Sequence, residues 1–252
     1  MRRFFTRLNI RPLAIVVTLL VWAGAAVAAP PETRLTLPKS GPVKVAFVVS
    51  DGATLIDIAG PMQVFEEIPA PGAPFLTFTV SQSRDPIKAG SLTIVPDYTF
   101  DNAPQPDIVV VGAQSGNSPP YLDYLHRMAV QGSLILSVCT GVTKLARAGL
   151  LDGLAATSHH DDIQMLRQMF PKVHFLPDQA WVHSAPRVYT AGGETSGIEL
   201  ALHIVELYYG RPVAVSTARA MDYRGPDWQG ISYAKSSHTR VDLPAARLHR
   251  VH

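Results

Sequence analysis

Short runs of apolar residues recur along this chain, and segments with helical spacing separate them. The runs that predict strands occupy residues 43–49, 75–80, 108–111, 134–138, 155–157 and 188–190. Apolar residues three and four apart predict helices over 58–68, 121–130, 142–148, 160–169 and 196–209, with Pro61 in the first turn of its helix. Strands that are apolar on both faces are typical of a parallel sheet covered on both sides. The sequence therefore predicts an α/β fold, a mainly parallel sheet sandwiched by helices in a single domain.

The N-terminus has the features of a secretory signal peptide. Four arginines come before or at the start of an apolar run over residues 12–27, and Ala26-Val27-Ala28 followed by Ala29 matches the A-x-A cleavage pattern. We expect cleavage after Ala28, so that residues 1–28 are removed and the domain is exported to the periplasm. The alternative is an uncleaved anchor, because the run is only slightly shorter than the roughly 20 residues that span a bilayer. In both cases we expect the body of the chain outside the cytoplasm.

Composition sets the remaining boundaries. Four prolines within residues 29–42 indicate an extended linker, residues 43–228 form the domain, and residues 229–252 form a polar tail without apolar periodicity.

The net charge is +2, and several positive residues belong to the signal peptide, so the mature domain is close to neutral. This charge gives no indication of nucleic-acid binding. We expect a small-molecule substrate as the partner, no nucleic acid, and no membrane contact after the signal peptide is cleaved.

Cys139 is the only cysteine of the chain. A single cysteine cannot close an intramolecular disulfide, so it is a buried small hydrophobe, an intermolecular link or a working thiol. It stands between a predicted strand and a predicted helix in Ser137-Val138-Cys139-Thr140-Gly141, with a small residue two positions to either side. This is the pattern of a nucleophile elbow. The N-terminus of the next helix favours the thiolate over the thiol, and the N–H of Thr140 can donate to a developing anion.

Further segments extend this pattern along the chain. After the elbow come Ala-Gly-Leu-Leu-Asp-Gly over 148–153 and Ala-Thr-Ser-His over 156–159, while Leu-Ile-Asp-Ile-Ala-Gly-Pro-Met fills 55–62 and Thr-Ala-Gly-Gly opens 190–202. Taken in their order along the chain, these segments resemble the ThiJ/PfpI superfamily, whose fold is the flavodoxin-like fold of class I glutamine amidotransferases. The resemblance covers most of residues 43–225.

Two positions indicate a branch of that superfamily. Asp57 and Thr140 are similar to residues of isonitrile hydratases and of the amidotransferase-like domains of certain transcription regulators. Those regulators carry an additional DNA-binding domain. Because the chain ends at His252 and begins with a signal peptide, we expect the hydratase branch and not the regulators.

The resemblance implies an exported lyase in which three residues act together. The Cys139 thiolate attacks the isonitrile carbon, Asp57 acts as acid or base with a raised pKa, and Thr140 supports the thiolate. Attack by water then releases an N-substituted formamide. The resemblance also implies a homodimer, and we expect neither a cofactor nor a metal.

Three further residues are expected around the nucleophile. Gly112 and Ala113 follow the strand over 108–111 and are expected to bind the substrate or a developing oxyanion. Ala113 stands where the hydratases usually carry a second glycine, so its N–H is usable only if the backbone there does not require positive φ. His159 falls where some superfamily members place a histidine beside the nucleophile.

Plainer interpretations of these residues stay open. Asp57 is also suited to cap its own helix. Residues 158–162 hold four potential metal ligands, but a Ser158 cap with aspartates in the first helical turn explains the same pattern. Glu199 and His203 are expected to be a structural pair on the last helix. Tyr223, Asp227 and Trp228 follow the last helical segment, and the resemblance implies that this region lies near the pocket.

Two other functions also remain alternatives. One is glyoxalase-like or deglycase-like chemistry on methylglyoxal adducts, which requires His159 next to Cys139. The other is a non-catalytic domain that binds a ligand or senses oxidants through Cys139, because a fold does not determine a function.

Overall fold

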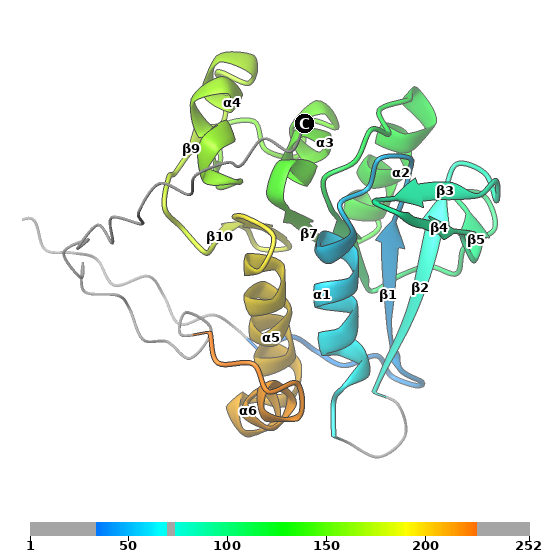
Figure 1. Cartoon of the computed structure of the whole chain (residues 1–252). Helices are drawn as coiled ribbons and strands as arrows, with labels where there is room; N and C mark the ends of the chain where they lie inside the picture. Colours follow the sequence, from blue (N-terminus) through cyan, green and yellow to red (C-terminus); the bar gives the residue numbers. More distant parts are fainter. Residues whose placement is uncertain (1–33, 70–73, 226–252) are drawn as a thin grey trace, which may run out of the picture. The chain divides into compact units, whose positions relative to one another are not determined.

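The fold is a seven-stranded sheet between two layers of helices (Figure 1). The computed structural model describes residues 34–69 and 74–225. The sheet has the order β10-β11-β7-β6-β1-β2-β5, and β10 with β11 is its antiparallel pair while the others are parallel. The strands of this sheet are β1 (Val43–Val48), β2 (Phe75–Ser81), β5 (Tyr98–Thr99), β6 (Ile108–Val111), β7 (Leu134–Val138), β10 (Trp181–Ala185) and β11 (Val188–Ala191). The predicted fold class is confirmed.

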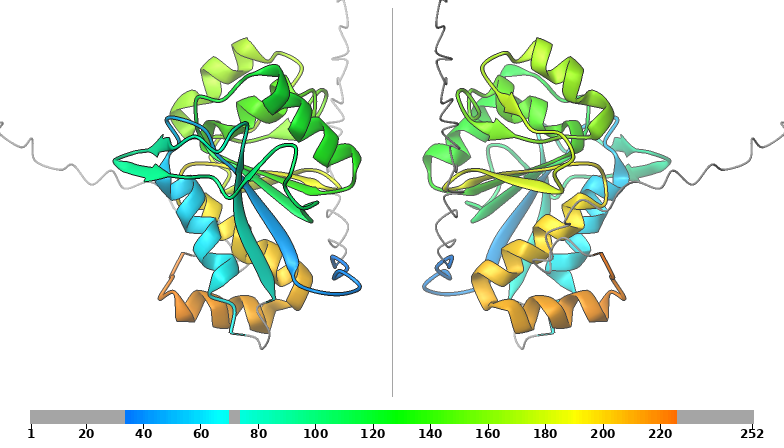
Figure 2. Two further views of the ribbon diagram at one scale, coloured as in Figure 1. Left: turned by 90° about the vertical axis from the view of Figure 1, so that its right-hand side faces the viewer. Right: turned by 90° about the vertical axis from the view of Figure 1, so that its left-hand side faces the viewer.

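The helices divide between the two faces of the sheet. They are α1 (Leu55–Glu66), α2 (Pro119–Val130), α3 (Val142–Arg147), α4 (Ile163–Met169), α5 (Ser196–Tyr209) and α6 (Arg211–Ala220), with short 3-10 helices η1 (Cys139–Gly141) and η2 (His160–Asp162). Val45 and Phe47 of β1 pack in the core with α1, α5 and α6, while Ala46 and Val48 pack with α2, α3 and α4. Figure 2 shows these two layers on opposite sides of the sheet. Alternate side chains of the buried strands therefore serve two separate cores.

The strand order predicts a crevice beyond the carboxyl ends of the parallel strands. β1 is hydrogen-bonded to β2 on one side and to β6 on the other, so the chain reverses direction across the sheet between β1 and β6. In open parallel sheets, such a reversal opens a crevice beyond the carboxyl ends of the strands. The loops that follow β1, β6 and β7 all reach this edge.

Several elements were not predicted from the sequence. They are the antiparallel pair β3 (Ile87–Ala89) and β4 (Leu92–Ile94), the pair of β8 (Ala155–Ala156) with β9 (His174–Phe175), of which only β8 was expected, the edge strands β5 and β10, and helix α6. These strands are only two to five residues long and partly exposed, so hydrophobic periodicity cannot be recognised in them. Helix α6 follows α5 directly after Gly210, whose φ of 84° ends the first helix.

Pro61 was placed in a first helical turn, and this prediction is wrong. Helix α1 begins at Leu55, so Pro61 lies inside the helix and is buried. Proline has no N–H to donate to the carbonyl four residues earlier, which here belongs to Asp57. The Asp57 carbonyl therefore receives no hydrogen bond from residue 61.

The chain ends lie mostly outside the described part of the structure. The predicted signal peptide, residues 29–33 of the linker, and residues 226–252 are in that category. Within the described part of the linker, the N–H of Leu35 donates to the carbonyl of Leu207 at 3.0 Å. Among helices of the described residues, none is long and apolar enough to cross a membrane.

Candidate active site

Cys139 occupies a strained turn between β7 and η1. Its φ is +56°, in the left-handed region that a non-glycine residue adopts at a cost of about 1–3 kcal/mol. Gly141 allows this turn to approach β6, since a Cβ at this position would collide with the Val111 carbonyl oxygen and lie 2.8 Å from that of Gly112. The backbone thus has the tight strand-to-helix turn that an elbow requires.

Hydrogen bonds from three directions hold the cysteine. Its N–H donates to the Gly192 carbonyl at 2.8 Å, and its carbonyl accepts from the Ser158 hydroxyl at 2.9 Å. The Thr140 N–H is directed at the sulfur, where it lowers the pKa of the thiol. Thr140 makes this contact with the sulfur through its backbone N–H.

The Cys139 thiol is nevertheless harder to ionise than an ordinary thiol. Burial raises its pKa to about 11, the charge of Asp57 adds to this rise, and the Thr140 N–H opposes it. The charges of Asp162 and Glu194 also raise the pKa. The helix N-terminus was expected to favour the thiolate, but burial and three carboxylates outweigh it, so the resting group near pH 7 is the neutral thiol.

Asp57 is buried at the start of α1. Its Oδ2 accepts the Ala113 N–H at 2.8 Å, while its Oδ1 is buried with no hydrogen-bond partner. Gly112 makes this approach possible, because a Cβ on it would lie 2.7 Å from the Asp57 Cβ. The helix begins after Thr54, and Asp57 makes no capping hydrogen bond, so the capping interpretation does not hold.

The environment of Asp57 raises the pKa of its carboxyl from 3.8 to about 6. Burial is the largest cause, and the Ala113 N–H opposes it by stabilising the charged form. Glu194 raises the pKa further, while His159 lowers it. A carboxyl that titrates near pH 6 can exchange a proton in either direction at neutral pH.

The structure brings Asp57 and Cys139 into one electrostatic site. The charge of Asp57 contributes to the high pKa of the Cys139 thiol, although no direct hydrogen bond between carboxyl and sulfur occurs within the described residues. Ala113 was expected to offer its N–H to a substrate oxyanion. Instead, this N–H is already used by Asp57 Oδ2, and the other carboxyl oxygen, Oδ1, is buried without a hydrogen-bond partner.

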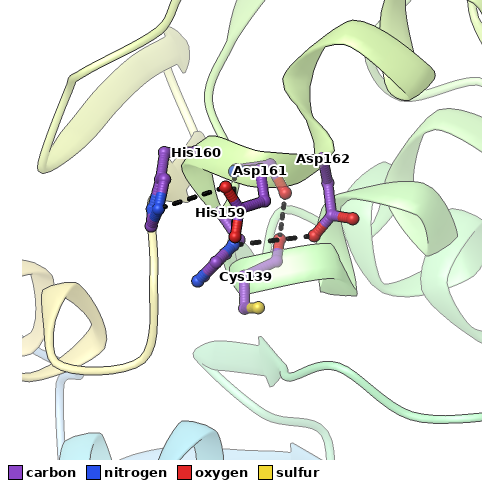
Figure 3. Close-up of polar contacts among 6 residues, drawn as sticks. Cys139, His159, His160, Asp161 and Asp162 are labelled. Atoms are coloured by element: carbon purple, nitrogen blue, oxygen red, sulfur yellow. Dashed lines mark hydrogen bonds and ion pairs between the residues drawn. The ribbon is translucent and has the colours of Figure 1, made fainter. Parts of the chain in front are cut away.

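His159 lies near this site, but its polar contacts are with residues of its own turn. Its Nδ1 accepts the Asp161 N–H at 3.4 Å and lies 3.9 Å from an Asp162 oxygen, and its ring contacts that of His160 in a tilted arrangement with the ring centres 4.3 Å apart. Figure 3 shows these four side chains beside Cys139, with the sulfur directed away from the two aspartates. No hydrogen bond from His159 to Cys139 is found in the described part of the chain.

The same four residues were weighed as metal ligands. Ligand atoms of His159, His160 and Asp161 lie within 4.8 Å of one another, and the His160 and Asp161 side chains are exposed. The His159 Nδ1 lone pair already receives the Asp161 N–H, which leaves the Nε2 of the same ring as its possible ligand atom. His159, not the expected Ser158, therefore caps η2.

A hollow of about 350 Å³ opens beside the elbow. Ser158 and Gly192, which bond the backbone of Cys139, lie in its wall, together with His160, Ser196 and Glu199. Its volume suffices for a small polar molecule, although Cys139 is not among the residues that line it.

Of the remaining predicted positions, Glu199 and His203 lie on α5 and Tyr223 follows α6. Glu199 is buried and accepts the Tyr223 hydroxyl at 2.7 Å, while the ring of His203 stacks on Trp181 at 4.2 Å. These contacts agree with the structural role expected for the pair. Asp227 and Trp228 lie outside the described residues.

The sequence did not identify two contributors to the site. The charge of Glu194, in the loop after β11, raises the pKa of both Asp57 and Cys139. Gln114 anchors the loop that carries Ala113. The position of Glu194 after a strand end was a usable signal, whereas nothing in the local sequence marks Gln114.

Comparisons with known proteins give a consistent family relationship. Residues 43–207 match the sequence model of the DJ-1/PfpI family. An isonitrile hydratase from Pseudomonas putida is 27% identical over 190 residues, which cover 72% of this chain and 78% of that protein. The crystal structure of a ThiJ/PfpI family protein from Pseudomonas syringae is 25% identical, with a TM-score of 0.62 over 82% of this chain and 87% of that one.

The similarity to a third protein corrects the expectation about partners. The HTH-type transcriptional regulator GbdR of Pseudomonas aeruginosa is 28% identical over 202 residues, or 77% of this chain, and the chain spans 53% of that regulator's length. The prediction that excluded nucleic acid and the regulators is contradicted by this similarity. Net charge reports only a direct electrostatic contact with nucleic acid, so it carried no information about relatives of this kind.

Proposed function

The chain belongs to the DJ-1/PfpI family, and from this membership we propose that it is a cysteine-dependent enzyme that hydrates a small isonitrile to an N-substituted formamide. One observation carries the proposal. Asp57 is a buried carboxyl with a pKa of about 6 and an unpartnered oxygen, and its charge raises the pKa of the only thiol of the chain, which lies in an elbow turn. The named hydratase among the relatives supports the choice of reaction.

The first step joins the thiol to the substrate. Because the thiol is neutral at rest, the Asp57 carboxylate takes the S–H proton as the sulfur bonds to the isonitrile carbon. Asp57 then delivers this proton to the same carbon. The product is a thioformimidate, with a new C–S bond, a new C–H bond and a C=N double bond in place of the isonitrile triple bond.

The second step adds water and releases the enzyme. Asp57 takes a proton from water as the oxygen bonds to the thioformimidate carbon, and it delivers this proton to the nitrogen, which restores the carboxylate. The C–S bond then breaks, the hydroxyl proton returns through Asp57 to the sulfur, and the N-substituted formamide leaves. The sum is one isonitrile plus one water giving one formamide, and both Asp57 and Cys139 return to their starting states.

Formamide release from a simple alkyl isonitrile tests the proposal directly. Wild type is expected to turn over, while Cys139→Ala is expected to show none because no C–S bond can form. The exposed Lys172→Ala variant, remote from the site, is a matched surface control. Absence of turnover in wild type across alkyl and aryl isonitriles contradicts the hydration reaction.

A second candidate is a non-catalytic ligand-binding domain. The similarity to the regulator GbdR favours it. In that case wild type and Cys139→Ala bind the same small molecules with equal affinity, and neither consumes them. A glyoxalase-like reaction is less well supported, because His159 caps η2. A redox sensor is also less well supported, because it needs a thiol of low pKa.

Export of the domain also belongs to the proposal. It rests on the arginines, the apolar run and the Ala26-Val27-Ala28 cleavage pattern of the sequence. Expression of the full chain in a Gram-negative host, followed by fractionation and intact-mass measurement, checks it. A periplasmic protein that begins at Ala29 is expected, and a full-length cytoplasmic protein contradicts it.

A further inference from the structure

One half-buried amide side chain fastens the loop after β6. Gln114 donates from its Nε2 to the Val48 carbonyl and to the Tyr121 hydroxyl, both at 2.8 Å. Its Oε1 accepts the Ser50 hydroxyl at 3.0 Å. Both N–H groups and the carbonyl oxygen of the amide are therefore engaged, which fixes the side chain in one orientation.

Backbone contacts extend this anchor to the neighbouring loop. The Ser50 hydroxyl accepts the Gly116 N–H at 2.7 Å, and the Ser115 N–H donates to the Asp51 carbonyl at 2.9 Å. The loop after β1 and the loop after β6 are thus tied together directly after Gln114.

The peptide next to Gln114 is the one that touches Asp57. The Ala113 N–H donates to Asp57 Oδ2 at 2.8 Å, and the Ala113 carbonyl accepts the Thr54 N–H at 2.9 Å. A small displacement of this loop removes the hydrogen bond that stabilises the charged carboxylate.

We propose that Gln114 is a positioning residue, which holds the Ala113 N–H on Asp57 Oδ2 and so leaves Oδ1 as the atom that exchanges a proton with Cys139. This inference rests on the proposed pairing of Asp57 with Cys139. Gln114 touches neither residue directly and acts through Ala113.

The other charged groups that act on Asp57 come from separate elements. Glu194 belongs to the loop after β11, His159 caps η2, and Cys139 belongs to the elbow. None of the hydrogen bonds of Gln114 involves them. Substitution of Gln114 therefore changes Asp57 through the Ala113 N–H, and the direction is upward, because that N–H lowers the pKa of the carboxyl.

Alkylation of Cys139 by iodoacetamide provides a readout that does not depend on turnover. Cys139 is the only cysteine, so the rate measured by intact mass belongs to it. Because the charge of Asp57 raises the pKa of the thiol, the pH profile of this rate is expected to contain an inflection where Asp57 titrates. The inflection is expected to disappear in Asp57→Asn, which assigns it to Asp57 rather than to His159.

The critical variant is Gln114→Met, which keeps the length of the side chain and removes its hydrogen bonds. The midpoint of the inflection is expected to move up by about one pH unit, because the Asp57 carboxylate loses one stabilising hydrogen bond. Gln105→Met is the matched control, because Gln105 also bonds a serine hydroxyl and a backbone carbonyl, of Ser133 and Pro106, but lies before β6. Its profile is expected to equal that of wild type.

A milder variant covers the case in which Gln114→Met fails to fold. Tyr121→Phe removes one of the two acceptors of the Gln114 Nε2 and keeps the edge-to-face contact with Phe100. It is expected to move the inflection in the same direction by a smaller amount.

The outcomes separate the two proposals. An inflection in wild type that neither Gln114→Met nor Tyr121→Phe moves overturns the role of Gln114 and leaves the Asp57–Cys139 pair intact. A wild type without the inflection, or an inflection that persists in Asp57→Asn, overturns the pair and the inference together.

Discussion

The ionisation of Asp57 makes a prediction about stability. Its carboxyl has a pKa of about 6 in the folded protein against 3.8 ordinarily, so the folded state binds the proton more tightly than the unfolded state. A carboxyl of this kind contributes stability below pH 3.8, and the contribution is lost as pH rises through 6. In Asp57→Asn this loss is absent.

The magnitude follows from the two values. Their difference is about 2.2 pH units, and at about 1.36 kcal/mol for each unit the full effect is about 3 kcal/mol. Because the carboxyl of the unfolded chain is already partly ionised at about pH 4, the interval from pH 4 to pH 8 contains about 2–3 kcal/mol of it. The buried Asn amide costs about 1–3 kcal/mol if it finds no partner, but this cost does not depend on pH.

Urea unfolding at pH 4 and pH 8 measures the effect. The free energy of unfolding of Asp57→Asn minus that of wild type is expected to increase by about 2–3 kcal/mol from pH 4 to pH 8. Lys172→Ala, whose partner Asp152 is on the surface, serves as the control for a general response to pH. A difference for Asp57→Asn that is the same at both pH values refutes the conclusion that Asp57 titrates at a raised pKa.

Three further predictions follow from the site. Asp57→Asn is expected to lower kcat/KM for an isonitrile by about 10²–10⁴-fold while raising the rate of Cys139 alkylation at pH 8, because the variant loses the proton carrier and also the charge that raises the pKa of the thiol. Parallel turnover and alkylation assays check it, and a fall in both rates contradicts it. Cys139→Gly is expected to be more stable than Cys139→Ala by about 1 kcal/mol in urea unfolding, since φ of +56° strains alanine and not glycine. Equal stabilities would show that the turn is relaxed in solution. Gly141→Ala is expected to lower the free energy of unfolding by about 2–4 kcal/mol, because its Cβ meets the Val111 carbonyl oxygen, and an unchanged midpoint refutes the close approach.

Sequence patterns were sufficient where the determining contacts are local. Helix α5 has the predicted bounds, and strands β6 and β7 lie where apolar runs ended at glycine and at Cys139. The elbow could also be predicted, because small residues on either side of Cys139 are a steric requirement of the turn. The relationship to the ThiJ/PfpI superfamily, inferred from separated motifs, is confirmed by the match over residues 43–207.

By itself, then, the sequence determined the layered α/β fold and the elbow turn at Cys139, and it predicted the nucleophile and the acid. Only the tertiary structure decided how these groups ionise and what they bind. Ala113 is 56 residues from the carboxyl it contacts, and burial, the largest cause of both pKa shifts, is a property of the assembled core. The local argument from a helix N-terminus predicted a thiolate at Cys139, and desolvation reversed it. Local spacing determines strands and turns, whereas the energy of a charge depends on every element packed around it.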